Sequence, residues 1–159
     1  MLKLTPKGWL SWDFLIGEHD LDFTLGEVAF SWMGEKGSIT LGQSTFKAYR
    51  RGMLGKEYAL ESNGVILARA EKTSLFRRSY EVRFGNRSYT LQAESMFHRA
   101  FVLMDGQTEV GWISPDGSIT RCTSAALPEH FPLPVKVFII WLVLLTWKQA
   151  AAAAAVAGG

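Results

Sequence analysis

Lysine and arginine are concentrated in one third of the chain. Between Gln43 and Thr90 there are ten of them against four carboxylates. Guanidinium and ammonium groups bind phosphate oxygens, and clusters of them attract anionic lipid surfaces. The candidate lipid-binding residues are Arg50, Arg51, Lys56, Arg69, Lys72, Arg77 and Arg78. The alternative interpretation is a solvated outer surface, on which pairs such as Arg83 with Glu81 or Glu57 contribute little.

A second polar stretch, Glu18-His19-Asp20-Leu21-Asp22, is dense in oxygen and nitrogen groups that ligate metals. It lacks the glycine and the spacing of a calcium-binding loop. We therefore interpret it as a polar connection between strands and expect no metal site.

A thiol nucleophile is the one catalytic arrangement to consider. It needs a base within hydrogen-bond reach, and Cys122 has His130 or His19 as candidates. Cys122 alternates with Thr123 in an expected strand, where cysteine is typically a small core residue. The sequence contains no nucleophile elbow, phosphate-binding glycine loop or zinc-protease motif. We expect a non-enzymatic protein without a cofactor.

Overall charge excludes several classes of protein. The chain of 159 residues has 17 Lys+Arg against 15 Asp+Glu, and this net charge of +2 argues against nucleic acid as a partner. A single cysteine excludes a disulfide scaffold.

Residues 11–35 hold six acidic side chains and no lysine or arginine, so a protein partner on this acidic face is an alternative function.

Short alternating segments separated by turn residues fill the region from 10 to 123. A two-residue turn at Gly85-Asn86 pairs Val82 with Tyr89 and Tyr80 with Leu91, which places four large side chains on one face. The same rule at Asn63-Gly64 pairs Leu60 with Leu67 and puts Val65 on their side, with Arg69 at a barrel mouth. The expected strands are 10–16, 21–25, 28–32, 38–41, 43–49, 57–61, 65–71, 79–84, 87–92, 99–104, 108–113 and 118–123.

The C-terminal segment has a different pattern. Residues 137–147 are apolar on every side of a helical wheel, and Pro134 suits a first turn. This run is about 16 Å long at 1.5 Å per residue, too short for a bilayer core of about 30 Å. We expect a core helix over 134–149 and an Ala-rich tail over 150–159. The alternative is a membrane span over 137–157, which places Lys148 and Gln149 in its centre.

About twelve consecutive short strands favour a closed antiparallel barrel. A barrel of that size is too wide for its own side chains to fill, and an apolar helix in the centre would fill it. Trp9, Trp12, Trp32 and Trp112 are expected to pack around this helix; lining a ligand pocket is the alternative.

The chain resembles the Tubby C-terminal-like superfamily, which includes Tubby-like proteins, phospholipid scramblases and the LURP-one-related proteins. The resemblance rests on residues 58–68 (YALESNGVILA), 87–91 (RSYTL), 101–105 (FVLMD) before Val110-Gly111, and the helix 137–147. It implies twelve strands around a buried hydrophobic helix, and association with phospholipid or a membrane surface. The cysteine-rich palmitoylation segment and the acidic loop before the last helix of scramblases have no counterpart here.

Together these patterns predict one all-β domain over 1–149, a closed barrel of about twelve strands with its core helix. The predicted function is a non-enzymatic module that binds anionic phospholipid, with Arg50, Arg51, Arg77 and Arg78 as leading residues. A membrane-anchored protein with a cytoplasmic β domain, or a protein-binding scaffold, are the alternatives. The N-terminus has no apolar run long enough for a signal peptide, so we expect a cytoplasmic protein. We also expect it to be a monomer and to be peripheral to a membrane.

Overall fold

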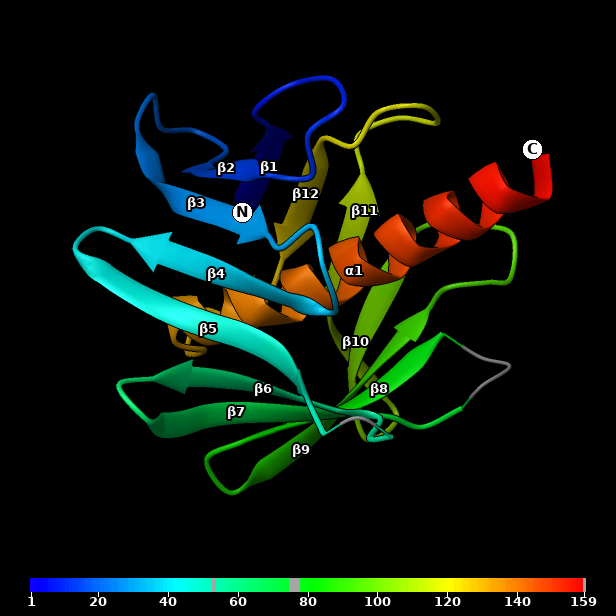
Figure 1. Cartoon of the computed structure of the whole chain (residues 1–159). Coiled ribbons are helices and arrows are strands. Elements are labelled where there is room, and N and C mark those ends of the chain that lie inside the picture. The colour runs from blue at the N-terminus through cyan, green and yellow to red at the C-terminus, as the bar shows by residue number, and fades with distance from the viewer. Residues whose placement is uncertain (53, 75–77, 159) are drawn as a thin grey trace.

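In the computed structural model, which describes residues 1–52, 54–74 and 78–158, twelve antiparallel strands close into a barrel around a C-terminal helix (Figure 1). The strands are β1 (Leu2–Pro6), β2 (Phe14–Glu18), β3 (Thr24–Phe30), β4 (Lys36–Leu41), β5 (Ser44–Arg51), β6 (Glu57–Ser62), β7 (Val65–Lys72), β8 (Ser79–Phe84), β9 (Arg87–Ala93), β10 (Phe101–Asp105), β11 (Thr108–Pro115) and β12 (Thr123–Ala126). The helix is α1 (Leu133–Gly158). The predicted fold class is confirmed.

Each strand pairs with its neighbours in the sequence, and the ring closes where β1 pairs with β12. Leu2 lies opposite Ala125 and Leu4 opposite Thr123. Leu2, Leu4, Thr123 and Ala125 are all buried, because alternate residues of these short strands point into the barrel. Closure leaves no unpaired sheet edge, so all twelve strands share one interior.

The barrel interior is filled by α1. Val135 and residues 137–147 are buried, and the helix has no polar face over this length. The indole of Trp141 is fully enclosed, with ring centroids 5.9 Å from Phe30, 6.0 Å from Tyr58 and 6.0 Å from Phe138. The wall makes room for it at Gly37, where a Cβ atom would lie 2.9 Å from the indole nitrogen. The predicted core helix is therefore confirmed.

The helix is longer than predicted, since it continues through the Ala-rich segment to Gly158. Residues 150–158 are exposed and extend beyond the strands (Figure 1). By length and composition α1 is able to cross a membrane, but 61% of its most apolar window is buried inside the barrel. In this structure, the strands of the barrel surround residues 137–147.

The hairpin at Gly85-Asn86 has the predicted register, with Val82 opposite Tyr89 and Tyr80 opposite Leu91. The hairpin at Asn63-Gly64 does not. A register shift between Leu60 and Glu61 places Leu60 opposite Ala68. One extra residue reverses the faces of the rest of the strand.

This shift overturns the predicted inward face of β7. Val65 and Leu67 are exposed, while Ala68 and Ala70 are buried. Arg69 consequently lies on the outer wall of the barrel, with 53% of its side chain exposed, and not at a barrel mouth. The side chains that β7 turns into the barrel are therefore the small ones of Ala68 and Ala70.

The predicted strands differ from the observed ones near both termini. β1 was not predicted, although Leu2 and Leu4 alternate as a strand requires. The expected strands 21–25 and 28–32 are a single strand, β3. The expected strand 118–123 is mostly a connection, and the strand that closes the barrel is Thr123–Ala126, made of small residues.

The predicted packing of four tryptophans around the helix is largely wrong. Trp9 and Trp32 are each 88% exposed and Trp112 is 36% exposed. Trp12 alone of the four packs against the core, in edge contact with Phe14 and under the guanidinium of Arg121. Trp9 and Trp32 lie in connections between strands, outside the alternation that turns every second side chain of a strand into the barrel.

Candidate functional site

The two ends of the barrel are built differently. At the entry end, where α1 begins, most connections are tight turns, for example 42–43, 63–64, 85–86 and 106–107. At the exit end, where α1 leaves the barrel, the connections are longer: 7–13, 31–35, 52–56, 73–78, 94–100 and 116–122. In Figure 1 the connections 31–35, 94–100 and 116–122 lie on the side of the barrel from which the helix emerges. Long loops positioned by a rigid scaffold are where binding residues concentrate.

Basic side chains gather at the exit end. We take the exit end as the exit-end connections, the two strand positions next to each, and the part of α1 that emerges from the barrel. Among the described residues, its basic side chains are Lys7, Lys36, Arg50, Arg51, Lys56, Lys72, Arg78, Arg99, Arg121 and Lys148. The acidic residues of the same region are fewer: Asp13, Glu35, Glu57, Glu71, Glu94 and Asp116. The exit end is therefore the basic end of the barrel.

The entry end has the opposite balance. Its turns, the strand positions next to them and the first turn of α1 hold the acidic residues Glu18, Asp20, Asp22, Glu61, Asp105, Glu109 and Glu129. The basic residues there are Arg83, Arg87 and Lys136, whereas Lys3 on β1 pairs at 3.7 Å with Asp116 of the exit-end connection 116–122. Although the net charge of the chain is close to zero, its charges are separated along the barrel axis. Such a separation orients a protein at a charged surface.

Exposed hydrophobic side chains gather at the exit end as well. In the described part of the chain, large hydrophobic side chains more than three-quarters exposed occur at Trp9, Leu10, Trp32, Leu54, Met96, Phe97, Ile119 and Val156. The first seven lie in exit-end connections, and Val156 lies on the emerging helix. Apolar side chains scattered singly are normal, whereas a collection at one end marks an interaction site.

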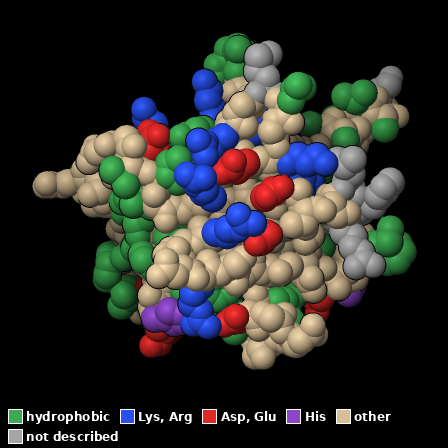
Figure 2. Space-filling model, turned by 90° about the horizontal axis from the view of Figure 1, so that it is seen from below, with side chains coloured by type: hydrophobic (Ala, Val, Ile, Leu, Met, Phe, Trp, Pro, Cys, Tyr) green, Lys and Arg blue, Asp and Glu red, His purple; other side chains and the backbone are tan. Residues whose placement is uncertain are grey.

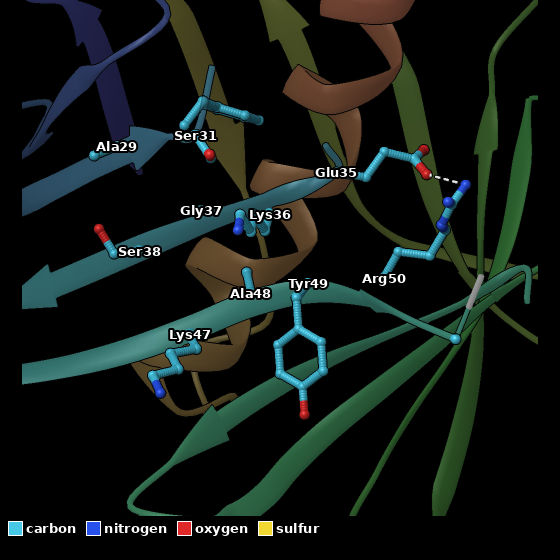
Figure 3. A pocket seen from close by; sticks show the side chains of 12 residues that line it. Ala29, Ser31, Glu35, Lys36, Gly37, Ser38, Lys47, Ala48, Tyr49 and Arg50 are labelled. Carbon is cyan, nitrogen blue, oxygen red and sulfur yellow. Dashed lines mark ion pairs between the residues drawn. The ribbon is translucent and has the colours of Figure 1, made fainter. Parts of the chain in front are cut away.

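A polar cluster closes the barrel at the exit end. Glu35 Oε1 accepts hydrogen bonds from the hydroxyl of Tyr58, at 2.8 Å, and from the amide of Gln149 on α1. Glu35 Oε2 lies 2.6 Å from Arg50 Nη1, as the dashed line in Figure 3 marks. Burial and the neighbouring Glu35 raise the pKa of Tyr58, so its phenol stays a neutral donor.

Further contacts hold the helix where it emerges. Trp147 Nε1 donates to the carbonyl of Arg99 at 2.9 Å, and the guanidinium of Arg99 lies 4.6 Å from the centre of the Trp147 ring. Burial lowers the pKa of Arg99, which nevertheless stays cationic as guanidinium groups do in proteins. The exit-end loops 31–35 and 94–100 are thereby held against the end of the buried helix.

We expect Glu35→Ala to reduce the free energy of unfolding by about 1–3 kcal/mol, because the buried Tyr58 hydroxyl loses its acceptor and Arg50 its partner. Urea unfolding followed by tryptophan fluorescence measures the change. The control is Glu81→Ala on the outer wall, where Glu81 pairs with Arg83 at 2.9 Å in solvent. That variant is expected to lose less than about 1 kcal/mol. Equal losses would contradict a structural role for the cluster.

The predicted lipid-binding residues do not all lie at the same place in the structure. Arg50, Arg51, Lys56, Lys72 and Arg78 lie at the exit end, whereas Arg69 lies on the wall. Arg77 lies outside the described residues. The arginines are engaged in contacts: Arg51 with Glu57 at 3.2 Å, Arg69 with Glu57 at 3.6 Å, and Arg78 with the carbonyls of Ser95 and His98. Figure 2 shows basic and acidic side chains alternating over one face of the barrel.

Three lysines of the exit end are more available to bind a phosphate group than the paired arginines. Within the described ranges, no carboxylate lies within ion-pair distance of the ammonium groups of Lys36, Lys56 and Lys72. Lys56 and Lys72 lie side by side, since the backbone N–H of Lys72 donates to the carbonyl of Lys56 at 2.9 Å. Lys36 borders a surface hollow of about 650 Å³ that Lys47 and Arg50 also line, on β4 and β5 (Figure 3).

The other predicted sites are dispersed. His19 and His130 lie in entry-end connections, at the opposite end of the barrel from Cys122. Glu18 pairs with the N-terminal amine, and over the residues that the structure describes no three His, Cys, Asp or Glu side chains come together as metal ligands. The acidic stretch 11–35 does not form one face: Asp13 and Glu35 lie at the exit end, and Asp20 and Asp22 at the entry end.

Comparison with protein-family models, curated proteins and solved structures returned no match.

Proposed function

We propose that this protein is a non-enzymatic module that docks with its exit end on a membrane surface containing anionic phospholipid, on the cytoplasmic side. The observation that carries the proposal is the coincidence of two features at one end of the barrel. The basic side chains and the strongly exposed hydrophobic side chains both gather where α1 emerges.

Electrostatics gives the orientation of the docked barrel. The basic exit end is attracted to anionic headgroups, and the acidic entry end is repelled by them. The resemblance to the Tubby C-terminal-like superfamily, with its association with phospholipid, points in the same direction. A cytoplasmic leaflet is the natural partner because it carries anionic lipid.

The proposal is tested by co-sedimentation with vesicles of phosphatidylcholine alone or with phosphatidylserine added. We expect binding that requires phosphatidylserine and weakens as salt is raised, because exposed charges are screened over about 10 Å at 0.1 M salt. The double variant Lys56→Glu/Lys72→Glu is expected to bind more than tenfold less tightly, since each cation near the surface contributes about 1 kcal/mol.

The matched control changes the same amount of charge at the other end of the barrel. Arg87→Glu/Lys136→Glu leaves the exit end intact and is expected to bind like the parent protein. Similar losses in the two double variants would show that net charge, and not the exit end, governs binding. Binding to phosphatidylcholine alone, independent of salt, would also overturn the proposal.

A further inference from the structure

The exposed hydrophobic residues of the exit end lie at the tips of its loops, and those tips are uncharged. Residues 8–12, 31–34, 95–97 and 117–120 contain no Asp, Glu, Lys or Arg. They hold the most exposed apolar side chains of these loops: Trp9, Leu10, Trp32, Met96, Phe97 and Ile119. Moving an uncharged apolar tip out of water costs little desolvation free energy.

The charged residues stand at the bases of the same loops. Lys7 precedes the first tip, Lys36 follows the second and Arg99 the third, and Arg121 follows the tip at 117–120. Along the barrel axis the exit end thus has two layers, with apolar tips outermost and charged residues behind them. The charged layer holds carboxylates as well as cations, since Asp13, Glu35, Glu94 and Asp116 flank the same four tips. The tail of α1 from Ala150 to Gly158 is uncharged too, so it does not oppose contact with apolar material.

This order matches the order of layers in a bilayer. Cations at the loop bases would meet the phosphate groups when the tips reach the acyl chains. Tryptophan is the residue most suited to that boundary, because its ring is large and apolar and its N–H still finds a polar partner. Binding to headgroups by charge alone would not require the exposed rings of Trp9, Trp32 and Phe97.

We propose, resting on the proposed function, that the exit-end tips insert into the boundary between headgroups and acyl chains, with the cations of the loop bases at the level of the phosphates. The protein is then an interfacial one: its tips are buried in a single leaflet, and α1 stays inside the barrel over residues 137–147. Insertion of this kind adds an apolar, salt-resistant contribution to membrane binding.

Single-cysteine labelling tests the insertion. In a Cys122→Ser background, Trp9→Cys, Trp32→Cys and Phe97→Cys each receive a polarity-sensitive fluorophore. Gln43→Cys and Gln107→Cys, in entry-end turns, are the controls. With vesicles containing phosphatidylserine, we expect a blue shift at the three tips and none at the controls. Separately, Trp9→Ser/Trp32→Ser should lower vesicle binding more than tenfold at high salt, because the two apolar rings no longer leave water on binding.

The outcomes separate the two proposals. Co-sedimentation without a blue shift at the tips, and with unchanged binding of Trp9→Ser/Trp32→Ser, overturns the insertion and leaves charge-driven docking in place. Absence of co-sedimentation overturns the proposed function itself. A blue shift without vesicles that grows with protein concentration, together with dimers in analytical ultracentrifugation, also overturns the insertion, because the tips then cover a second copy of the chain.

Discussion

A chain that ends at Leu133 is expected to lose the cooperative unfolding transition and to lack a folded barrel. Residues 137–147 fill the barrel interior, and each fully buried large apolar side chain contributes about 1.5–3 kcal/mol. Several such contributions exceed the whole stability of an ordinary domain, about 5–15 kcal/mol. Circular dichroism and urea unfolding of the truncated chain measure the effect.

The matched control ends at Gln149, which removes the exposed tail and keeps the buried part of α1. This shorter truncation is expected to unfold at the same urea concentration as the parent, because residues 150–158 bury no side chain. A soluble body that ends at Leu133 and still unfolds cooperatively would show that the strands do not need the helix. It would favour α1 as a membrane anchor.

Trp141→Ala is expected to lower the free energy of unfolding by about 3–5 kcal/mol. The ring is fully buried against Phe30, Tyr58 and Phe138, and strands paired all round the barrel cannot collapse into the space that it leaves. Chemical denaturation measured with the same protocol for each variant gives the value.

The control for Trp141 is Trp32→Ala, the same substitution at a ring that is 88% exposed. Its effect on stability is expected to stay within about 0.5 kcal/mol. A loss below about 1 kcal/mol in Trp141→Ala would contradict enclosure of the ring, because a cavity of that size always costs more.

Much of the barrel follows from local patterns in the sequence. The Gly85-Asn86 turn fixes the register of β8 and β9 because a two-residue loop leaves one pairing for Val82 and Tyr89. The segment 137–147 has to be enclosed because it is apolar on all sides. The total of twelve strands was right partly through two compensating errors, the missed β1 and the split β3.

The predicted and observed strands differ where contacts between distant parts of the chain determine the pairing. The register shift between Leu60 and Glu61 has no sequence signal, and it turns Val65 and Leu67 outward. The strand Thr123–Ala126 is made of small residues and pairs with β1 to close the ring, so long-range pairing rather than hydrophobicity makes it a strand. Ile119 lies inside the expected strand 118–123, yet it is 97% exposed in a loop.

The candidate site was predicted only in part. A basic surface was expected, but the exposed tryptophans were assigned to the core, and the candidate lipid-binding residues did not include Lys7, Lys36, Arg99, Arg121 and Lys148. One signal was available. In a meander every second connection lies at the same end, so loops that contain Trp32, Leu54 and Phe97 share an end once the strands are counted correctly.

Hydrogen–deuterium exchange with and without phosphatidylserine vesicles tests most directly which surface meets the membrane. Docking by the exit end predicts slower exchange in the presence of vesicles at residues 7–13, 31–35 and 94–100, and unchanged exchange at the entry-end turns 42–43 and 85–86. Protection at the entry-end turns or along the outer wall, with the exit-end loops unchanged, would contradict docking through the exit end.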